Sequence, residues 1–400
     1  MTERRLNLGV AGLGRGFMLM LPTLSSDPRL KLAAAADPRP EARERFAAEF
    51  GARTYATVEE LCRDDDVQAI YIATPHQFHA AHAIAAAAAG KHMLIEKPMA
   101  VTLDECAAIV AAAQAARVHV VIGHSHSFDA PIAEAKRLID SGAYGKLRLI
   151  TAFNFTDFLY RPRRPEELDT AQGGGVLFNQ GAHQIDMARL LAGGLVESVR
   201  GVTGRWDSAR PTEGAYTAFL TFAGGAAATL TYSGYGHFDS DEFCDWIGES
   251  GLRKSAAQHG AARRALGGIA DAAAEAALKV AQGYGGPQAG GGADPGQRLH
   301  AHFGVVIASC ERADLRPLSN GIMIYGDEAR RLHPLPPPAV PRAEVIDELY
   351  AAAMLGEPPV HSGAWGMATL EVCHAILRSA AEGRELRLAY QVPPQAARTA

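Results

Sequence analysis

Two adjacent residues that could take part in proton transfer, a carboxylate and an amine, follow a short apolar run in the first quarter of the chain. The run from His92 to Ile95 is typical of a buried strand, and Glu96, Lys97 and Pro98 come directly after it. Proline prevents the strand from continuing, and ligands of open α/β sheets bind at the carboxyl ends of the strands. We therefore predict that Lys97 lies at a ligand-binding edge. A surface ion pair that caps the strand is the alternative.

A histidine that could act as a general base stands near the middle of the chain. The glycine triplet 173–175 leads into a helical pattern that continues through Leu191. Spacings of four and three residues would place Asn179, His183 and Asp186 on one face of that helix. With an ordinary pKa of about 6.5, a histidine is a natural general base at neutral pH. The alternative is a histidine that only packs and hydrogen-bonds within its helix.

A glycine-rich turn near the amino terminus has the composition of a phosphate-binding loop. Residues 6–11 are predicted to form a strand, and the turn Gly-Leu-Gly-Arg at 12–15 precedes a helical pattern through Leu24. Glycines there let backbone amides approach a pyrophosphate at the amino terminus of the helix. The pattern is imperfect, because the third glycine of G-x-G-x-x-G would fall on Phe17.

An acidic residue at the end of the next predicted strand strengthens this interpretation. Leu30 to Ala36 forms that strand, and Asp37 stands 25 residues after Gly12. A carboxylate in this position can accept hydrogen bonds from the adenosine ribose hydroxyls and would repel a 2′-phosphate. We therefore predict a dinucleotide site that prefers NAD to NADP, although Arg39 could accommodate the 2′-phosphate of NADP.

Strand and helix patterns alternate through the first 126 residues. This alternation predicts a doubly wound parallel sheet of the Rossmann type over 1–126 and a second, α/β domain over 127–400. The alanine- and glycine-rich stretch 253–300 is predicted to be a variable insertion. Further strands are predicted at 69–73, 118–122, 146–155, 216–222, 226–232 and 321–325, and helices at 40–50, 57–62, 80–89, 103–116, 130–141, 343–354 and 366–381.

The overall composition narrows the possible functions. A chain of 400 residues with 48% hydrophobic and 21% charged residues is expected to form two globular domains. A net charge of −5 argues against nucleic acid as a partner, and five scattered cysteines suit a reducing compartment. Because Arg15 interrupts the apolar amino-terminal stretch and no stretch is apolar enough to span a membrane, we expect a cytoplasmic enzyme.

The remaining histidines are predicted not to bind a metal ion. His76, His79 and His82 stand three residues apart, and His124 and His126 stand two apart. Zinc needs a fuller ligand set, and the sequence shows no cysteine or acidic cluster with either group. His79 is expected to pack inside the first domain, whereas His126 follows a sheet strand and is a candidate substrate contact.

Together, these motifs resemble the Gfo/Idh/MocA oxidoreductase family in their order and spacing over nearly the whole chain. The resemblance implies an NAD-binding Rossmann domain and a C-terminal domain with a large, mostly antiparallel open sheet. It also implies a homo-oligomer, a dimer or tetramer, formed through that sheet. The resemblance rests on Gly12-Leu13-Gly14, Asp37, Ala73-Thr74-Pro75 with His79, and Glu96-Lys97-Pro98. The cofactor-binding residues that it implies are Gly12, Leu13, Gly14, Arg15, Asp37, Thr74, Pro75, Glu96 and Lys97.

The resemblance also implies a catalytic pair. The family usually carries Asp-x-x-x-His where this chain has Asn179 and His183. Lys97 and His183 are thus expected to handle the proton of a substrate hydroxyl, with Lys97 desolvated beside the cofactor. Because an asparagine cannot take a proton, Asn179 is expected to hydrogen-bond a substrate hydroxyl or to orient His183.

Three segments resemble bacterial members of the family that oxidise aromatic cis-dihydrodiol carboxylates such as phthalate 4,5-cis-dihydrodiol. They are the stretches 124–129, 160–164 and 232–239. The expected substrate contacts are His126, Asp157, Arg161 and Asn179, of which Arg161 could bind a carboxylate through two parallel hydrogen bonds. For the arginines at 161–164, a solvated basic loop is the alternative. Two rival functions remain open, a sugar or inositol dehydrogenase of the same family and a non-catalytic dinucleotide sensor.

Overall fold

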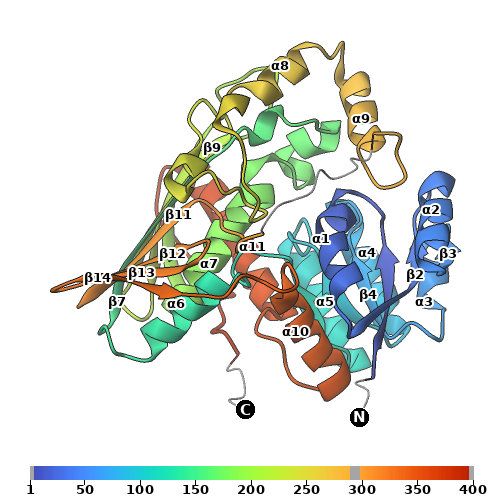
Figure 1. Cartoon of the computed structure of the whole chain (residues 1–400), viewed down its shortest axis with the longest axis horizontal. Coiled ribbons are helices and arrows are strands. Elements are labelled where there is room, and N and C mark those ends of the chain that lie inside the picture. The colour runs from blue at the N-terminus through green and yellow to red at the C-terminus, as the bar shows by residue number, and fades with distance from the viewer. Residues whose placement is uncertain (1–3, 289–297, 396–400) are drawn as a thin grey trace.

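The computed structural model describes residues 4–288 and 298–395 and contains two sheets, each covered by helices (Figure 1). The first sheet is parallel throughout, with the order β3-β2-β1-β4-β5-β6, which confirms the predicted doubly wound fold. The sequence pattern does not predict β3, because three residues are too few to show an alternation. The strands are β1 (Leu6–Ala11), β2 (Leu30–Ala36), β3 (Arg53–Tyr55), β4 (Ala69–Ile72), β5 (His92–Ile95) and β6 (Val120–Ile122).

Helices connect these strands, and two of them begin at capping boxes. Thr57 and Thr102 each accept a hydrogen bond from the backbone N–H three residues on, and the glutamate there bonds back to the threonine N–H. This reciprocal bonding satisfies amides that the first helical turn leaves free. The helices are α1 (Arg15–Ser26), α2 (Pro40–Phe50), α3 (Val58–Cys62), α4 (His79–Ala88) and α5 (Leu103–Ala116).

The strand order reverses between β1 and β4, and the glycine-rich turn lies at this point. Gly12 has a φ of +90°, and a Cβ added there would stand 2.9 Å from the carbonyl oxygen of Ala73. Only glycine permits both the conformation and this close approach. The turn after β1 therefore lies directly beside the end of β4, where open α/β sheets bind their ligands.

The second sheet has nine strands in the order β14-β13-β12-β11-β7-β10-β9-β8-β15. Among these described strands only β7 and β10 pair in parallel, which confirms the predicted large, mostly antiparallel sheet. The strands are β7 (Leu147–Phe155), β8 (Val196–Gly204), β9 (Ala215–Phe222), β10 (Ala227–Ser233), β11 (Val305–Cys310), β12 (Ala313–Leu318), β13 (Gly321–Gly326), β14 (Arg330–Pro334) and β15 (Leu386–Arg387).

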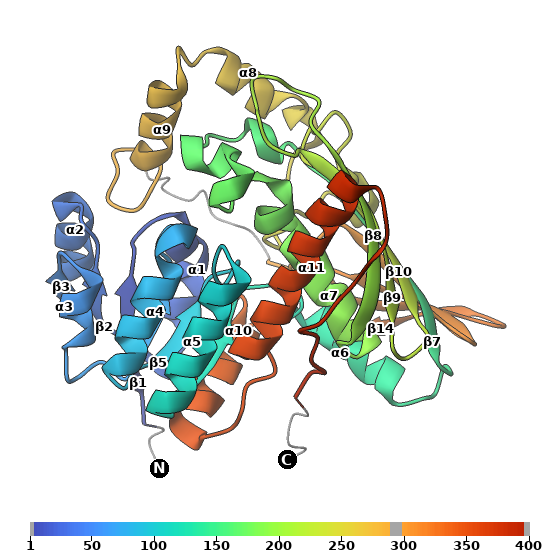
Figure 2. The same ribbon diagram turned by 180° about the vertical axis from the view of Figure 1, so that it is seen from behind.

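Helices cover one face of this sheet and leave the other open (Figure 2). They are α6 (Ala130–Asp140), α7 (Ala182–Ala192) and α11 (Gly363–Glu382). Large apolar side chains of the sheet strands, Leu149, Val202 and Phe219, are exposed. A homo-oligomer formed through this sheet stays a prediction. No helix among the described residues is long and apolar enough to cross a membrane.

The carboxyl-terminal part of the chain returns to the first sheet. Val345, Ile346 and Leu349 of α10 (Ala343–Tyr350) are fully buried in the same apolar cluster as β1 and α1. The predicted assignment of all of 127–400 to the second domain is therefore wrong for this helix. The sequence shows an amphipathic helix here but not the surface that covers it.

The predicted insertion 253–300 forms two helices in its described part, α8 (Ala261–Gly267) and α9 (Ala272–Ala281), while 289–297 lies outside the described residues. Glu275 of α9 is buried and pairs with the buried Arg210 at 2.9 Å. Just after α9, Tyr284 packs edge-on against Phe17 of α1, with ring centroids 5.1 Å apart. Figure 1 shows α9 between the two domains. Residues of the insertion therefore contact both domains.

Candidate active site

Lys97 connects the two domains. It follows β5, and its Nζ donates a hydrogen bond of 2.6 Å to the main-chain oxygen of Asn179, which lies in the turn before α7. Burial lowers the pKa of Lys97 to about 8, against the opposing effect of Glu96. The expected desolvation is present, and the amine stands between the edge of the first sheet and the glycine-triplet helix.

His183 is buried in α7 with only 7% of its surface exposed. Its Nδ1 has no hydrogen-bond partner within the described part of the chain. Burial, and then the positive charge of Lys97, hold the pKa of His183 well below its usual range. The expectation of an ordinary pKa near 6.5 is therefore wrong, because the sequence does not show how deeply α7 is covered. His183 is a neutral imidazole at physiological pH.

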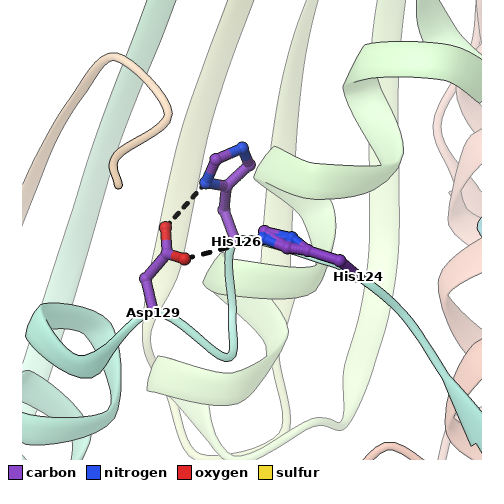
Figure 3. Close-up of side chains that lie close together, drawn as sticks. All are labelled: His124, His126 and Asp129. Atoms are coloured by element: carbon purple, nitrogen blue, oxygen red, sulfur yellow. Dashed lines mark hydrogen bonds and ion pairs between the residues drawn. The ribbon is translucent and has the colours of Figure 1, made fainter. Parts of the chain in front are cut away.

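A second histidine group lies beside His183, at the end of β6 (Figure 3). Oδ2 of Asp129 lies 2.6 Å from Nδ1 of His126, and its Oδ1 lies 3.7 Å from Nε2 of His124. The rings of His126 and His183 are 4.9 Å apart between centroids. All four side chains are buried, so one cluster joins the edge of the first sheet to α7.

Sequence reasoning missed two members of this cluster. Asp129 stands three residues after His126, immediately before α6, and this spacing is a signal that could have identified it. It adds one carboxylate to the two histidines, which were predicted to have no acidic cluster beside them. Phe303, whose ring lies 4.9 Å from both His126 and His183, is more than a hundred residues away in sequence and carries no local signal.

Neither Asn179 nor Asp186 hydrogen-bonds His183 among the described residues. The side chain of Asn179 donates to the carbonyl oxygens of Gly173 and Gly175, so it does not orient His183. Asp186 accepts hydrogen bonds from Trp365 and Thr369 of α11 and from Ser127. The turn 177–181 is π-helical, and its different angular spacing breaks the predicted pattern. A contact of Asn179 with a substrate hydroxyl stays a prediction.

The arginine loop is more ordered than a solvated basic loop. The guanidinium of Arg163 stacks on Phe158 at 3.6 Å and is only 10% exposed, and Arg164 pairs with Glu166. Arg161 donates from Nε to Asp157 at 2.9 Å, and Glu249 lies 3.9 Å from its NH1. These carboxylates raise the pKa of Arg161 against the effect of burial. The two terminal nitrogens of the Arg161 guanidinium, Nη1 and Nη2, are the atoms that could bind a substrate carboxylate.

The glycine-rich turn fits a dinucleotide pyrophosphate. Gly14 precedes α1, no side chain caps this helix, and no atom lies within 4 Å of the position that a Cβ of Gly14 would take. Open space and free amides at a helix amino terminus suit an anion. Leu13 is buried and Arg15 begins the helix, so the predicted pyrophosphate contacts stand together at this end of α1.

Asp37 lies at the same turn but is already engaged. Its carboxylate accepts hydrogen bonds from the N–H of Leu13 at 2.8 Å and from the backbone and guanidinium of Arg39. The guanidinium also donates to the carbonyl oxygens of Leu13 and Tyr284. Ribose hydroxyls that bond to Asp37 would therefore replace the Arg39 side chain. The role of Asp37 in cofactor binding stays a prediction.

The other predicted cofactor residues line the neighbouring strand ends. The main-chain oxygen of Thr74, which precedes Pro75, lies 2.8 Å from Nε2 of His79. His79 is fully buried and also bonds to the oxygen of Pro98, as expected for a packed residue. Burial raises the pKa of Glu96, which accepts a hydrogen bond from Tyr71. These groups surround the point where the strand order reverses.

Comparison with known proteins identifies both domains. Residues 6–124 match the oxidoreductase family with an NAD-binding Rossmann fold, and residues 132–252 match the GFO/IDH/MocA C-terminal domain. The chain is 48% identical over 373 residues to a 1-carboxy-3-chloro-3,4-dihydroxycyclohexa-1,5-diene dehydrogenase from Comamonas testosteroni, covering 93% of this chain and 94% of that one. It is 31% identical to a levoglucosan dehydrogenase from Pseudarthrobacter phenanthrenivorans over 237 residues, 55% of this chain and 60% of that one.

A solved structure shows the same architecture throughout. A protein of known crystal structure from Bordetella bronchiseptica, 41% identical, superposes with a TM-score of 0.90 over 96% of this chain and 100% of that one. The matches cover both sheets and the motifs on them. The chain belongs to the Gfo/Idh/MocA oxidoreductase family and is a dehydrogenase that uses NAD and acts on CH–OH groups.

Proposed function

We propose that the protein oxidises a carboxylated cis-dihydrodiol of an aromatic ring to a ketone, which becomes a catechol. The observation that carries this proposal is the 48% identity, over nearly the full length of both chains, to a dehydrogenase whose name specifies a carboxylated dihydroxycyclohexadiene. The partly exposed guanidinium of Arg161 supports a substrate that carries a negative charge. Aromatisation makes the overall reaction favourable.

Lys97 is the group best suited to accept the hydroxyl proton. When bound, NAD would supply the acceptor for the hydride of the same carbon. With a pKa of about 8, Lys97 is partly neutral at physiological pH and can take a proton. Its bond to the Asn179 oxygen holds the amine in place. The neutral His183 can hydrogen-bond the hydroxyl and keep it aligned with the amine.

This assignment predicts a pH dependence. Because the pKa of Lys97 is lowered to about 8, the neutral amine is a minor form below this pH and the main form above it. The rate of oxidation in a single turnover should rise with pH around pH 8 and then reach a plateau. Lys97→Ala should abolish this rise. A rise centred near pH 6.5 would instead assign the proton to a histidine of ordinary pKa.

The carboxylate of the substrate is expected to bind Arg161. Charge-assisted hydrogen bonds contribute about 1.5–3 kcal/mol each, so Arg161→Ala should lower kcat/KM for a carboxylated dihydrodiol roughly 10- to 150-fold. The matched control is the same dihydrodiol without the carboxylate, which should react poorly with the wild type and lose little more in the variant. Equal losses on both substrates would mean that Arg161 supports its loop through Asp157 and does not bind the carboxylate.

The cofactor preference is expected to favour NAD over NADP. Asp37 would repel a 2′-phosphate, and Arg39 is held by Asp37, Leu13 and Tyr284. Asp37→Ser should reduce the ratio of NAD to NADP affinity by about tenfold or more, measured by fluorescence titration of each cofactor. Wild-type protein that binds NADP more tightly than NAD would show that the assignment of Asp37 is wrong.

A substrate panel separates the proposal from its rivals. Purified protein with NAD is offered carboxylated dihydrodiols, uncarboxylated dihydrodiols, inositols and anhydrosugars, and NADH absorbance gives kcat/KM for each. The carboxylated dihydrodiols should react with the highest kcat/KM. Preference for neutral polyols would identify a sugar or inositol dehydrogenase, and NAD binding without turnover of any alcohol would identify a dinucleotide sensor.

A further inference from the structure

We infer that His126 and Asp129 form a second proton-transfer pair, which catalyses the aromatisation of the ketone that oxidation produces. This inference rests on the proposed function and adds a second chemical step to the same site. It assigns His126 as the group that removes a carbon-bound proton and Asp129 as the group that positions it.

The geometry of the pair favours one tautomer of the neutral imidazole. Nδ1 of His126 lies 2.6 Å from a carboxylate oxygen of Asp129, and both residues are at most 5% exposed. Such a short bond places the ring proton on Nδ1 and leaves Nε2 as an acceptor, as in the pair that orients a catalytic histidine in hydrolases. Nε2 of His126 makes no hydrogen bond to the residues that the structure describes. Its ring lies 4.9 Å from His183, so this acceptor stands beside the predicted hydroxyl site.

The same distance favours a hydrogen bond over a shared metal ion. Two ligand atoms of a tetrahedral zinc site, each about 2.1 Å from the ion, lie roughly 3.4 Å apart. Nδ1 of His126 and Oδ2 of Asp129 are much closer than that and have the separation of a hydrogen bond. Nε2 of His124 is also unpartnered within the described residues and lies 3.7 Å from Oδ1 of Asp129. A shared proton therefore explains the arrangement better than a shared ion.

The chemistry requires two separate acceptors. Oxidation converts one carbinol carbon to a carbonyl and leaves one proton on Lys97. The neighbouring carbon still carries a hydrogen and a hydroxyl. When its C–H bond breaks, the proton goes to Nε2 of His126, the electron pair completes the aromatic ring, and the carbonyl oxygen takes the proton from Lys97. The product is the catechol, with no further oxidation or reduction, and His126 then releases its proton to solvent.

Both acceptors follow strands of the first sheet, Lys97 after β5 and His126 after β6. In a cis-diol both hydroxyls project from one face of the ring and both C–H bonds from the other. His183 belongs to α7 of the second domain, whereas His126 follows β6 at the edge of the first sheet, the edge at which the cofactor is expected. The hydrogen that remains after oxidation lies on the face from which the hydride left, which is the face where the cofactor is expected.

The test follows the two steps separately in one turnover. Wild type, His126→Gln and Asp129→Asn are mixed with NAD and a carboxylated dihydrodiol, and NADH and catechol are recorded by their different absorbances. In the wild type both should appear together. In each variant catechol should lag behind NADH by about tenfold or more, and deuterium on the second carbinol carbon should slow catechol formation alone. His119→Gln, on the chain just before β6, is the control. NAD titration and thermal melting of every variant show that the site is folded.

Each other outcome contradicts the inference in a different way. If NADH and catechol slow together in folded variants, His126 acts in the oxidation step. If catechol never lags, the ketone aromatises without help from the protein. A divalent cation that copurifies with the wild type and is lost in Asp129→Asn would show that the pair binds a metal ion and does not share a proton. If the wild type forms no NADH from any dihydrodiol, the proposed function itself is wrong.

Discussion

Lys97→Ala should lower turnover about 10²-fold or more while NAD binding stays largely intact. The amine is the group whose pKa, about 8, is matched to accepting the hydroxyl proton, and methyl cannot replace it. His183→Ala should cause a loss of similar size, because the hydroxyl would lose its buried hydrogen-bond partner next to Lys97. Turnover and NAD titration of the purified variants measure the two effects separately.

A matched variant tests whether this loss is specific. Lys31 is an exposed lysine on β2, in the same domain as Lys97. Lys31→Ala removes the same chemical group and should keep wild-type turnover. If Lys97→Ala or His183→Ala also keeps wild-type turnover, that residue has no part in the mechanism.

Glu275→Ala should lower the free energy of unfolding by about 3–5 kcal/mol, because it leaves the Arg210 guanidinium buried without a counter-charge. Glu275 also accepts a hydrogen bond from the N–H of Arg163 at 2.7 Å, so the arginine loop loses a contact as well. Urea unfolding followed by circular dichroism measures the change.

An exposed ion pair is the control for this loss. Glu382 of α11 pairs with Arg378, whose side chain is 62% exposed. Glu382→Ala should cost less than about 1 kcal/mol, since solvent screens such pairs. Equal small losses in both variants would mean that α9 is not an integral part of the fold.

Most of the first sheet could be predicted from the sequence because its elements other than β3 carry local signals. The buried runs of β1, β2 and β5 end at breakers, and α3 and α5 begin at threonines with a glutamate three residues on. The position of Lys97 follows from the same logic, because the end of a central parallel strand lies at the ligand-binding edge.

The state of the candidate site could not be predicted, because it depends on contacts between distant segments. The lowered pKa of His183 results from burial and then from Lys97, His126 and His124, all of which are far from it in sequence. Phe303 reaches the cluster from the strand region after the insertion. The π-helical turn before α7 has no recognisable sequence signal, and it separates Asn179 from the face that helical spacing predicts.

The structure of the insertion 253–300 could not be predicted from the local sequence either. An alanine-rich segment without clear periodicity predicts a variable loop. In the structure the segment is held in place by ion pairs. Glu275 pairs with Arg210, and Lys279 pairs with Glu167 next to the arginine loop. Each of these partners lies tens of residues away, so only the folded chain shows that they belong together.

The most direct test of the central claim is the stoichiometry of one reaction. Purified protein is incubated with NAD and a carboxylated cis-dihydrodiol, NADH is quantified by absorbance, and the aromatic product is identified by mass spectrometry. The proposed function predicts one NADH and one carboxylated catechol for each dihydrodiol consumed. NADH without a catechol, or no NADH from this substrate while a neutral polyol is oxidised, would contradict it.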